Sequence, residues 1–295
     1  MLHVSSNSPT SRPSPRQRRI YTPEPLLRHP VVMLREIAQD VWAGRGLAWR
    51  LFLRDLRAGY RQTLLGYVWA FLPPLVAAAT FIFLQSQGIT RIEVVGISYA
   101  AFALMGTLLW QIFVDALTSP SASFGAAKAM LVKINFPREA VLVGGLYMVI
   151  FNALIRMLLI AAVMILWNIP VGPTLAFLPV ALFGLLAAGF ALGLFITPIS
   201  ALYGDAARAI PIVAGFWMLL TPVVYPPQMG GIAGWLATWN PVSPLIVTAR
   251  ECLTGQTLTM LGPFFVVTAA SLLLILVGLI GFRIAMPHLI ERMGG

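Results

Sequence analysis

Apolar residues in this chain are gathered into long runs, separated by short segments that carry most of the charges and prolines. A helix needs about 20 apolar residues to cross the hydrocarbon core of a membrane. We therefore predict an all-α integral membrane fold with six transmembrane helices, over residues 64–85, 98–118, 140–167, 174–200, 209–225 and 260–284. The fifth run contains Pro211 and Pro222, and at about 25 Å it makes a short span.

An amphipathic helix is predicted just before the first span, over residues 47–61. Its apolar stripe recurs at helical spacing and consists of Trp49, Phe52, Leu53, Leu56 and Tyr60. A row of arginines follows one residue on, about 100° around the helix, and consists of Arg50, Arg54, Arg57 and Arg61. Such a helix lies in the membrane interface with its arginines among phosphates. A positively charged flank with no further role is the alternative.

Two short pieces between the fifth and sixth runs, residues 231–239 and 243–253, are amphipathic and too short to span. Asn240, which precedes a proline, marks the break between them. We expect two half-helices on the outer face, with Trp235 and Trp239 at headgroup depth. They would form a lid on a pathway or a fixed buttress.

Composition and charge place the chain in a membrane. It has 295 residues, of which 59% are hydrophobic and 10% charged, and a net charge of +10. Seventeen of the 20 Lys and Arg fall on one side of the predicted spans and two, Arg91 and Arg250, on the other. By the positive-inside rule both termini are cytoplasmic. Residues 1–33 are predicted to be a disordered basic tail, and no nucleic-acid partner is expected because most of the chain enters lipid.

One arginine, Arg156, lies deep inside a predicted span. Burying a charge there costs about 2.5–3.5 kcal/mol on insertion scales, so it should face the bundle interior or water. Asp115 is the nearest candidate partner, and Asn152 lies one turn before the arginine. Two roles stay open for Arg156, a structural ion pair and a contact to a phosphate.

Aromatic residues in the spans would suit a pathway for sugar rings. Together with Asn152 and Arg156, the pathway candidates are Tyr67, Trp69, Phe71, Tyr147, Trp217 and Tyr225. The segment after the second span, SPSASFGAAKAMLVKINFPREA, is predicted to be a short helix that breaks at Phe136-Pro137. This segment is either a docking surface or a plain turn.

Several catalytic motifs are absent from the sequence. There is no GxxxxGK[ST] phosphate loop, HExxH or GxSxG. Cys252 is the only cysteine, so no disulfide framework or zinc cluster is expected. We expect a transport subunit, not an enzyme, with no metal and no cofactor of its own.

Four ordered stretches resemble ABC-2 type permease subunits that export polysaccharide, the group of O-antigen and teichoic acid exporters. They are RDLRAGYRQTLLGYVWAFLPPL, LVKINFPREA, YGDAARAIPIVAGFWMLLTPVVYP and NPVSPLIVTARECLTG. The resemblance runs from about residue 40 to the end, so residues 34–295 form one transmembrane domain. Gly204 departs from the family, which often has arginine there.

The resemblance implies a homodimer in the bacterial inner membrane, with a separate ATP-binding subunit beneath each copy holding ATP and Mg. The outer half-helices would be gate helices. The substrate would be a lipid-linked glycan on undecaprenyl pyrophosphate. Coupling to the ATPase would use Arg50, Arg54, Asp55, Arg57, Arg61, Lys128, Lys133, Phe136, Pro137 and Arg138.

Two alternatives remain at this stage. One is an ABC-2 permease for capsule glycan, lipid or a small hydrophobic compound. The other is a membrane-bound transferase acting on lipid-linked sugars, which would need a cluster of acid, base or metal ligands at one depth that the sequence lacks.

Overall fold

The computed structural model of the chain describes residues 30–61, 68–88, 96–133, 138–227 and 232–294. Within these residues every regular element is a helix, which confirms the all-α fold class. The first two are α1 (Pro30–Arg61) and α2 (Val68–Ser86), followed by α3 (Tyr99–Lys133), α4 (Glu139–Leu166) and the short η2 (Pro173–Phe177). The remaining helices are α5 (Leu178–Leu202), α6 (Gly204–Leu220), α7 (Ile232–Trp239), α8 (Ser243–Thr254) and α9 (Leu261–Gly294).

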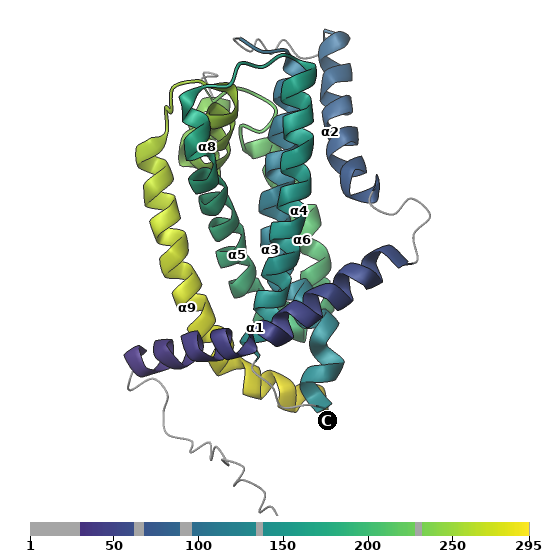
Figure 1. Cartoon of the computed structure of the whole chain (residues 1–295), viewed down its shortest axis with the longest axis vertical. Coiled ribbons are helices and arrows are strands. Elements are labelled where there is room, and N and C mark those ends of the chain that lie inside the picture. The colour runs from purple at the N-terminus through teal and green to yellow at the C-terminus, as the bar shows by residue number, and fades with distance from the viewer. Residues whose placement is uncertain (1–29, 62–67, 89–95, 134–137, 228–231, 295) are drawn as a thin grey trace, which may run out of the picture.

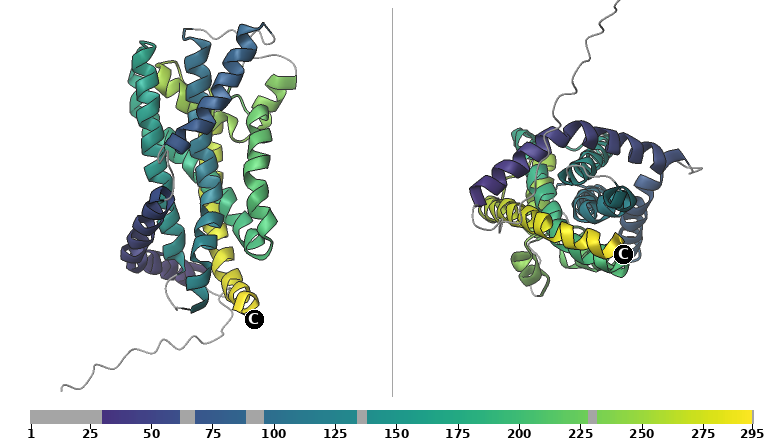
Figure 2. Two further views of the ribbon diagram at one scale, coloured as in Figure 1. Left: turned by 90° about the vertical axis from the view of Figure 1, so that its right-hand side faces the viewer. Right: turned by 90° about the horizontal axis from the view of Figure 1, so that it is seen from below.

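The long helices run side by side, with α3 and α5 packed together and α4 and α9 against them, while α1 lies across one end (Figure 1). We call this the α1 end of the bundle. The α7–α8 hairpin lies at the opposite end, and the last described turn of α9 returns to the α1 end, as Figure 2 shows from two further sides. Both ends of the described chain are thus on one side of the bundle.

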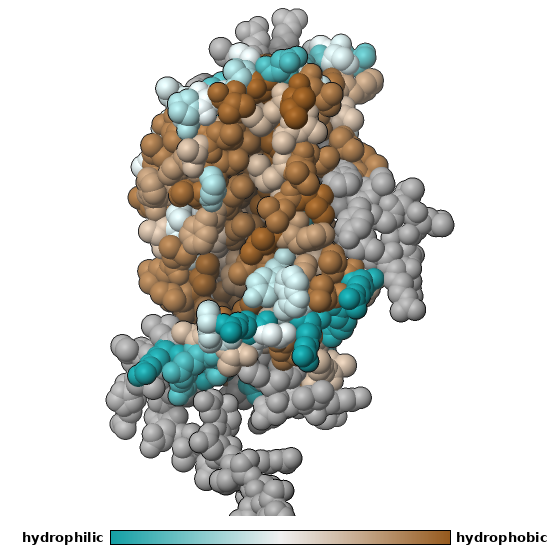
Figure 3. Space-filling view, in the orientation of Figure 1, coloured by the Kyte–Doolittle hydropathy of each residue, from teal (hydrophilic) through white to brown (hydrophobic). Residues whose placement is uncertain are grey.

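Within the described ranges, four helices are long and apolar enough to cross a membrane, judged by length and composition. They cover Tyr99–Leu131, Glu139–Leu166, Pro173–Leu202 and Leu261–Ala285. Figure 3 shows the resulting apolar belt, bounded by hydrophilic residues at the two ends of the bundle. The other two predicted spans correspond to α2 and α6, and α2 contributes only the shorter apolar stretch Leu75–Ser86. The prediction of six spans therefore stays a prediction.

The helix of the second predicted span does not end at residue 118. Helix α3 continues through Pro120 to Lys133, so the segment predicted as a separate short helix is a continuation of the same helix. Proline inside a helix removes a hydrogen bond, but here tertiary packing against α5 holds the chain in place. A side chain at Gly193 would meet the Pro120 ring at 2.9 Å, and Thr197 lies within 3.3 Å of the Ser121 hydroxyl.

The amphipathic helix is longer than predicted. It begins at Pro30, a position where proline suits a first helical turn, and not at residue 47. The basic tail therefore ends before residue 30, and its predicted disorder lies outside the described residues. The buried face carries Ile37, Ala48, Leu51 and Phe52, while Trp49 is more than half exposed at its edge.

Candidate functional site

Arginines on α1 form an exposed basic face across the α1 end of the bundle. The side chains of Arg50, Arg54 and Arg57 are exposed, and Arg54 pairs with the neighbouring Asp55 at 2.8 Å. Hydrophilic residues gather along this helix in Figure 3. The side chain of Arg61 lies outside the described residues. The α1 end therefore presents positive charge to whatever lies beneath or beside it.

The opposite face of α1 is fixed to α4 by aromatic rings. Phe52 lies edge-on to Tyr147 and Phe151, with ring centroids 6.3 and 6.0 Å apart. Trp49 also contacts Tyr147, at 6.0 Å. Tyr147, which the sequence placed in the pathway, thus lies at the α1–α4 junction and ties the basic helix to the bundle.

The other predicted coupling residues are only partly described. Lys128 is exposed on the extension of α3, and Arg138 is half-buried directly before α4. Lys133 ends α3, but its side chain lies outside the described residues, as do Phe136 and Pro137. The last turns of α3, which include Lys128, lie at the α1 end together with the basic face of α1 (Figure 1).

Arg156 and Asp115 meet inside the bundle, as their spacing suggested. The Arg156 Nη1 atom donates to Asp115 Oδ2, and Asn152 Nδ2 donates to the same oxygen at 3.1 Å. The two charged side chains are only 9% and 21% exposed. Their charges compensate one another at membrane depth, where an unpaired ion is costly, so the pair fastens α4 to α3.

Trp217 is half-buried on α6, and its ring packs against α3. Its ring lies edge-on to Phe113 at 5.6 Å and to Trp110 at 6.2 Å, and its indole N–H donates to Asn240. Tyr225 is half-buried in the segment after α6. Three pathway candidates lie outside the description: Tyr67 altogether, and Trp69 and Phe71 in their side chains.

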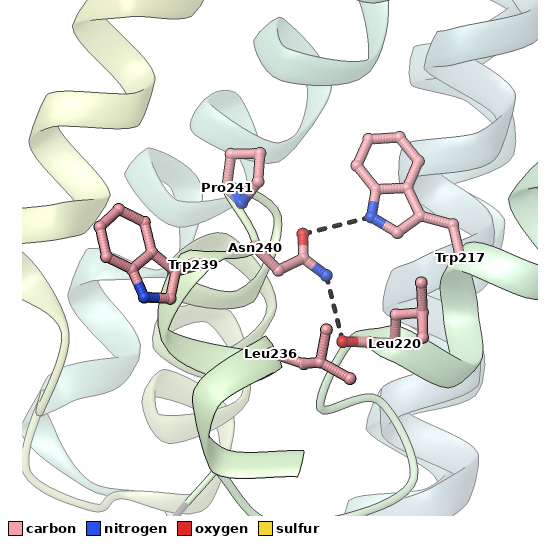
Figure 4. A pocket seen from close by; sticks show the side chains of 6 residues that line it. All are labelled: Trp217, Leu220, Leu236, Trp239, Asn240 and Pro241. Carbon is pink, nitrogen blue, oxygen red and sulfur yellow. Dashed lines mark hydrogen bonds between the residues drawn. The ribbon is translucent and has the colours of Figure 1, made fainter. Parts of the chain in front are cut away.

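Asn240, in the turn between α7 and α8, holds the end of α6 by its side chain (Figure 4). Its Oδ1 accepts the Trp217 indole N–H at 3.3 Å, and its Nδ2 donates to the Leu220 carbonyl at 3.3 Å and to the Thr221 hydroxyl at 2.8 Å. Because α6 ends at Leu220, the backbone carbonyl of that residue has no partner within the helix, and the asparagine amide supplies one.

Arg250 completes this attachment from inside α8. Its guanidinium donates to the carbonyls of Pro222 at 2.8 Å and Val223 at 2.9 Å, and it lies 3.8 Å from the centroid of the Phe102 ring. The sequence had counted this arginine among the outer flanks. The residue lies on α8, at the end of the bundle opposite α1 (Figure 1), and it is only 5% exposed, because its guanidinium binds backbone carbonyls of the segment that follows α6.

Burial lowers the pKa of Arg250 to about 9, against the opposing effect of the Glu251 carboxylate, so the guanidinium is still charged at neutral pH. The Val223 carbonyl that it binds also presses against α3. A Cβ atom at Gly106 would lie 2.1 Å from that oxygen. The segment that follows α6 is thus held at the Val223 carbonyl, between Gly106 on α3 and Arg250 on α8.

The two half-helices differ in their burial. Every residue of α8 is buried, so this half-helix is packed among other parts of the chain, and the expected position of both half-helices on the outer face stays a prediction. By contrast, Trp235 and Trp239 on α7 are mostly exposed, Trp239 at 73%. A cavity of about 180 Å³ lies between α6 and α7, lined by Trp217, Leu220, Leu236, Trp239, Asn240 and Pro241. Helix α8 is therefore packed inside the end of the bundle, whereas α7 presents its tryptophans at the surface.

Comparison with known proteins places this arrangement in a family. The family model described as ABC-2 type transporter matches residues 47–254. An O-antigen export system permease protein RfbA of Klebsiella pneumoniae is 23% identical over 209 residues, which are 70% of this chain and 79% of that protein. A Myxococcus xanthus protein of the same name is 23% identical over 250 residues, 81% of this chain and 92% of its own length. The match to more than half of the chain shows that it belongs to the ABC-2 type transporter family.

Proposed function

We propose that this chain is the permease subunit of an ATP-driven exporter that carries polysaccharide of the O-antigen type across the bacterial inner membrane. The observation that carries the proposal is the similarity over most of the chain to permeases of O-antigen export systems. Family membership identifies a transport subunit and not an enzyme. ATP and Mg would be bound by a separate ATPase subunit.

The basic face of α1 supports a cytoplasmic position for the α1 end. The positive-inside rule assigns the side of the membrane that carries the excess of Lys and Arg to the cytoplasm. Exposed Arg50, Arg54 and Arg57 give the α1 end such an excess. With α2 and α6 counted as the first and fifth spans, the chain crosses six times and both termini are cytoplasmic. The ATPase would dock at this end, on α1 and the extension of α3 that carries Lys128.

A second copy of the chain is part of the proposal. Apolar side chains of α6 are exposed in the single chain, among them Ile212, Val213 and Phe216. Lipid or a second protomer would cover them, and a polymer as wide as a glycan needs a pathway between subunits. The cargo that we propose is a glycan linked to a lipid by pyrophosphate.

The test is deletion of the gene, followed by complementation. We expect lipid-linked glycan to accumulate on the cytoplasmic side, and the protein to co-purify with an ATPase subunit in mild detergent. Accumulation of a phospholipid or a small hydrophobic compound instead would assign another cargo to the same permease. Normal surface glycan after deletion would overturn the proposal.

A further inference from the structure

A cluster of four charged side chains joins α1 to α9 and α4 at the α1 end. Arg283 on α9 places its Nη2 atom 3.0 Å from Glu36 Oε2 and 3.3 Å from Asp40 Oδ2, both on α1. Its Nη1 atom lies 3.7 Å from Glu139 Oε1, at the first residue of α4. Glu36 and Asp40 are one helical turn apart, so they present two carboxylates to one guanidinium.

This cluster is a polar attachment of the first half of α1 to the bundle. Among the described side chains of residues 35–46, Ile37 is the only large apolar one that is buried. The second half of α1 is held differently, by Leu51 and by Phe52 against Tyr147. In Figure 2, the view from below shows the start of α1 meeting α9 at the edge of the bundle.

The two sides of the cluster are not equivalent. Arg283 Nη2 makes a normal hydrogen bond to Glu36, whereas Nη1 is buried without a hydrogen-bond partner because Glu139 is too far away. The Arg283 side chain is 16% exposed and that of Glu139 only 9%, so the Nη1 donor that lacks a hydrogen-bond partner lies opposite a nearly buried carboxylate. A shift of less than 1 Å would let the guanidinium bond to Glu139.

We propose that Arg283 is a positioning residue through which a movement of α1 reaches α9, with the guanidinium held by Glu36 and Asp40 in one state and by Glu139 in the other. The proposal rests on the proposed function, in which α1 faces the ATPase. It adds a residue outside the stretch that the family model matches, residues 47–254. Guanidinium–carboxylate contacts suit such a switch because each geometry is discrete. The Glu139 side is nearly buried, where such a contact is strong, whereas the Glu36 side chain is 47% exposed and its contact is screened by solvent.

The test measures the distance between α1 and α9 in the purified full-length chain, before any transport is assayed. Spin labels are placed at Gln39→Cys and Ile284→Cys, both exposed, in a Cys252→Ala background. We expect one narrow distance distribution in the parent protein. Glu36→Gln with Asp40→Asn should broaden it, and Glu139→Gln should leave it narrow. A second label pair, Leu158→Cys and Leu273→Cys, should stay unchanged in every variant.

The matched control is Asp205→Asn, which removes a carboxylate from an exposed pair with Arg208 at the same end of the bundle. In cells, the Glu36/Asp40 double variant should export about tenfold less glycan at equal membrane level, while ATP hydrolysis by the complex continues. Arg283→Lys should restore part of the export that Arg283→Gln loses. An unchanged label distance in the Glu36/Asp40 variant would overturn the role proposed for Arg283, even where export fails. If the chain proved to carry no glycan, the proposed function would fail, but the measured change in label distance would still stand.

Discussion

Arg156 on α4 and Asp115 on α3 form an ion pair within the bundle, although 41 residues separate them in the sequence. Asn152 reinforces the pair from the same face of α4. The guanidinium is therefore engaged by a carboxylate, which favours the structural role over the phosphate-binding role among the two that the sequence left open.

Removing one member of this pair should destabilise the protein far more than removing both. Arg156→Met leaves a buried carboxylate without its cation, and such a change costs about 3–5 kcal/mol. Adding Asp115→Asn removes that charge and keeps an oxygen for Asn152, so the double variant should recover most of the loss. Thermal unfolding midpoints in detergent would measure both. Equal destabilisation of the single and double variants would refute a pairing role.

Gly106 on α3 should tolerate no side chain. Its substitution by Ala would place a methyl group 2.1 Å from the backbone oxygen of Val223, which Arg250 holds in place. Overpacking of this kind costs about 1–3 kcal/mol. Gly125→Ala on the same helix is the matched control, because nothing lies within 4 Å of its Cβ position.

The control should even gain stability, by about 0.5–1 kcal/mol, since alanine favours a helix over glycine. The difference between the two variants, measured as thermal midpoints in the same detergent, is the informative quantity. If Gly106→Ala and Gly125→Ala were equally stable, the segment that follows α6 would be able to move away from α3 without loss of stability.

The sequence predicted the positions of helices better than it predicted their ends. Residues 140–167 were expected for the helix that the structure places at Glu139–Leu166, because charge and proline bound an apolar run on both sides. The continuity of α3 beyond residue 118 was missed because the apolar run ends there. Close packing of Pro120 against Gly193, on another helix, accompanies the continued helix and cannot be seen in a local pattern.

The hydrogen bonds and ion pairs between helices were the least predictable part of the site. Arg250 bonds to backbone carbonyls, which every residue has, so no partner type marks it in the sequence. Arg283 finds Glu36 across 247 positions. By contrast, Arg156 and Asp115 could be paired from the sequence because charges inside spans are rare and must be compensated.

The basic face of α1 should be needed for export but not for insertion of the later spans. Replacing Arg54, Arg57 and Arg61 together by Glu reverses three charges next to the phosphates, each of which contributes about 1 kcal/mol of attraction. We expect export to fall at an unchanged membrane level, and less ATPase subunit to co-purify. The same three positions changed to Gln should give an intermediate effect. Unchanged export in the Glu variant would remove α1 from the coupling mechanism.

Cys252 offers a direct test of whether α8 moves during transport. The thiol is completely buried in α8, and this burial, with a smaller contribution from the Glu251 carboxylate, raises its pKa to about 11. At pH 7 the reactive thiolate is therefore scarce as well as inaccessible. Because Asn240 and Arg250 fasten the hairpin to the end of α6, we expect no maleimide labelling at rest or during ATP turnover.

Denaturation in SDS should expose Cys252 and give full labelling, which calibrates the assay. Arg250→Gln is the positive control in the folded protein, because it removes the cation that binds the carbonyls of Pro222 and Val223 and should loosen α8. A Cys252→Ala chain carrying Trp239→Cys should react readily, since that position on α7 is exposed. Labelling of Cys252 that rises with ATP turnover in the otherwise unaltered chain would show that α8 itself opens, and would assign the gate to both half-helices.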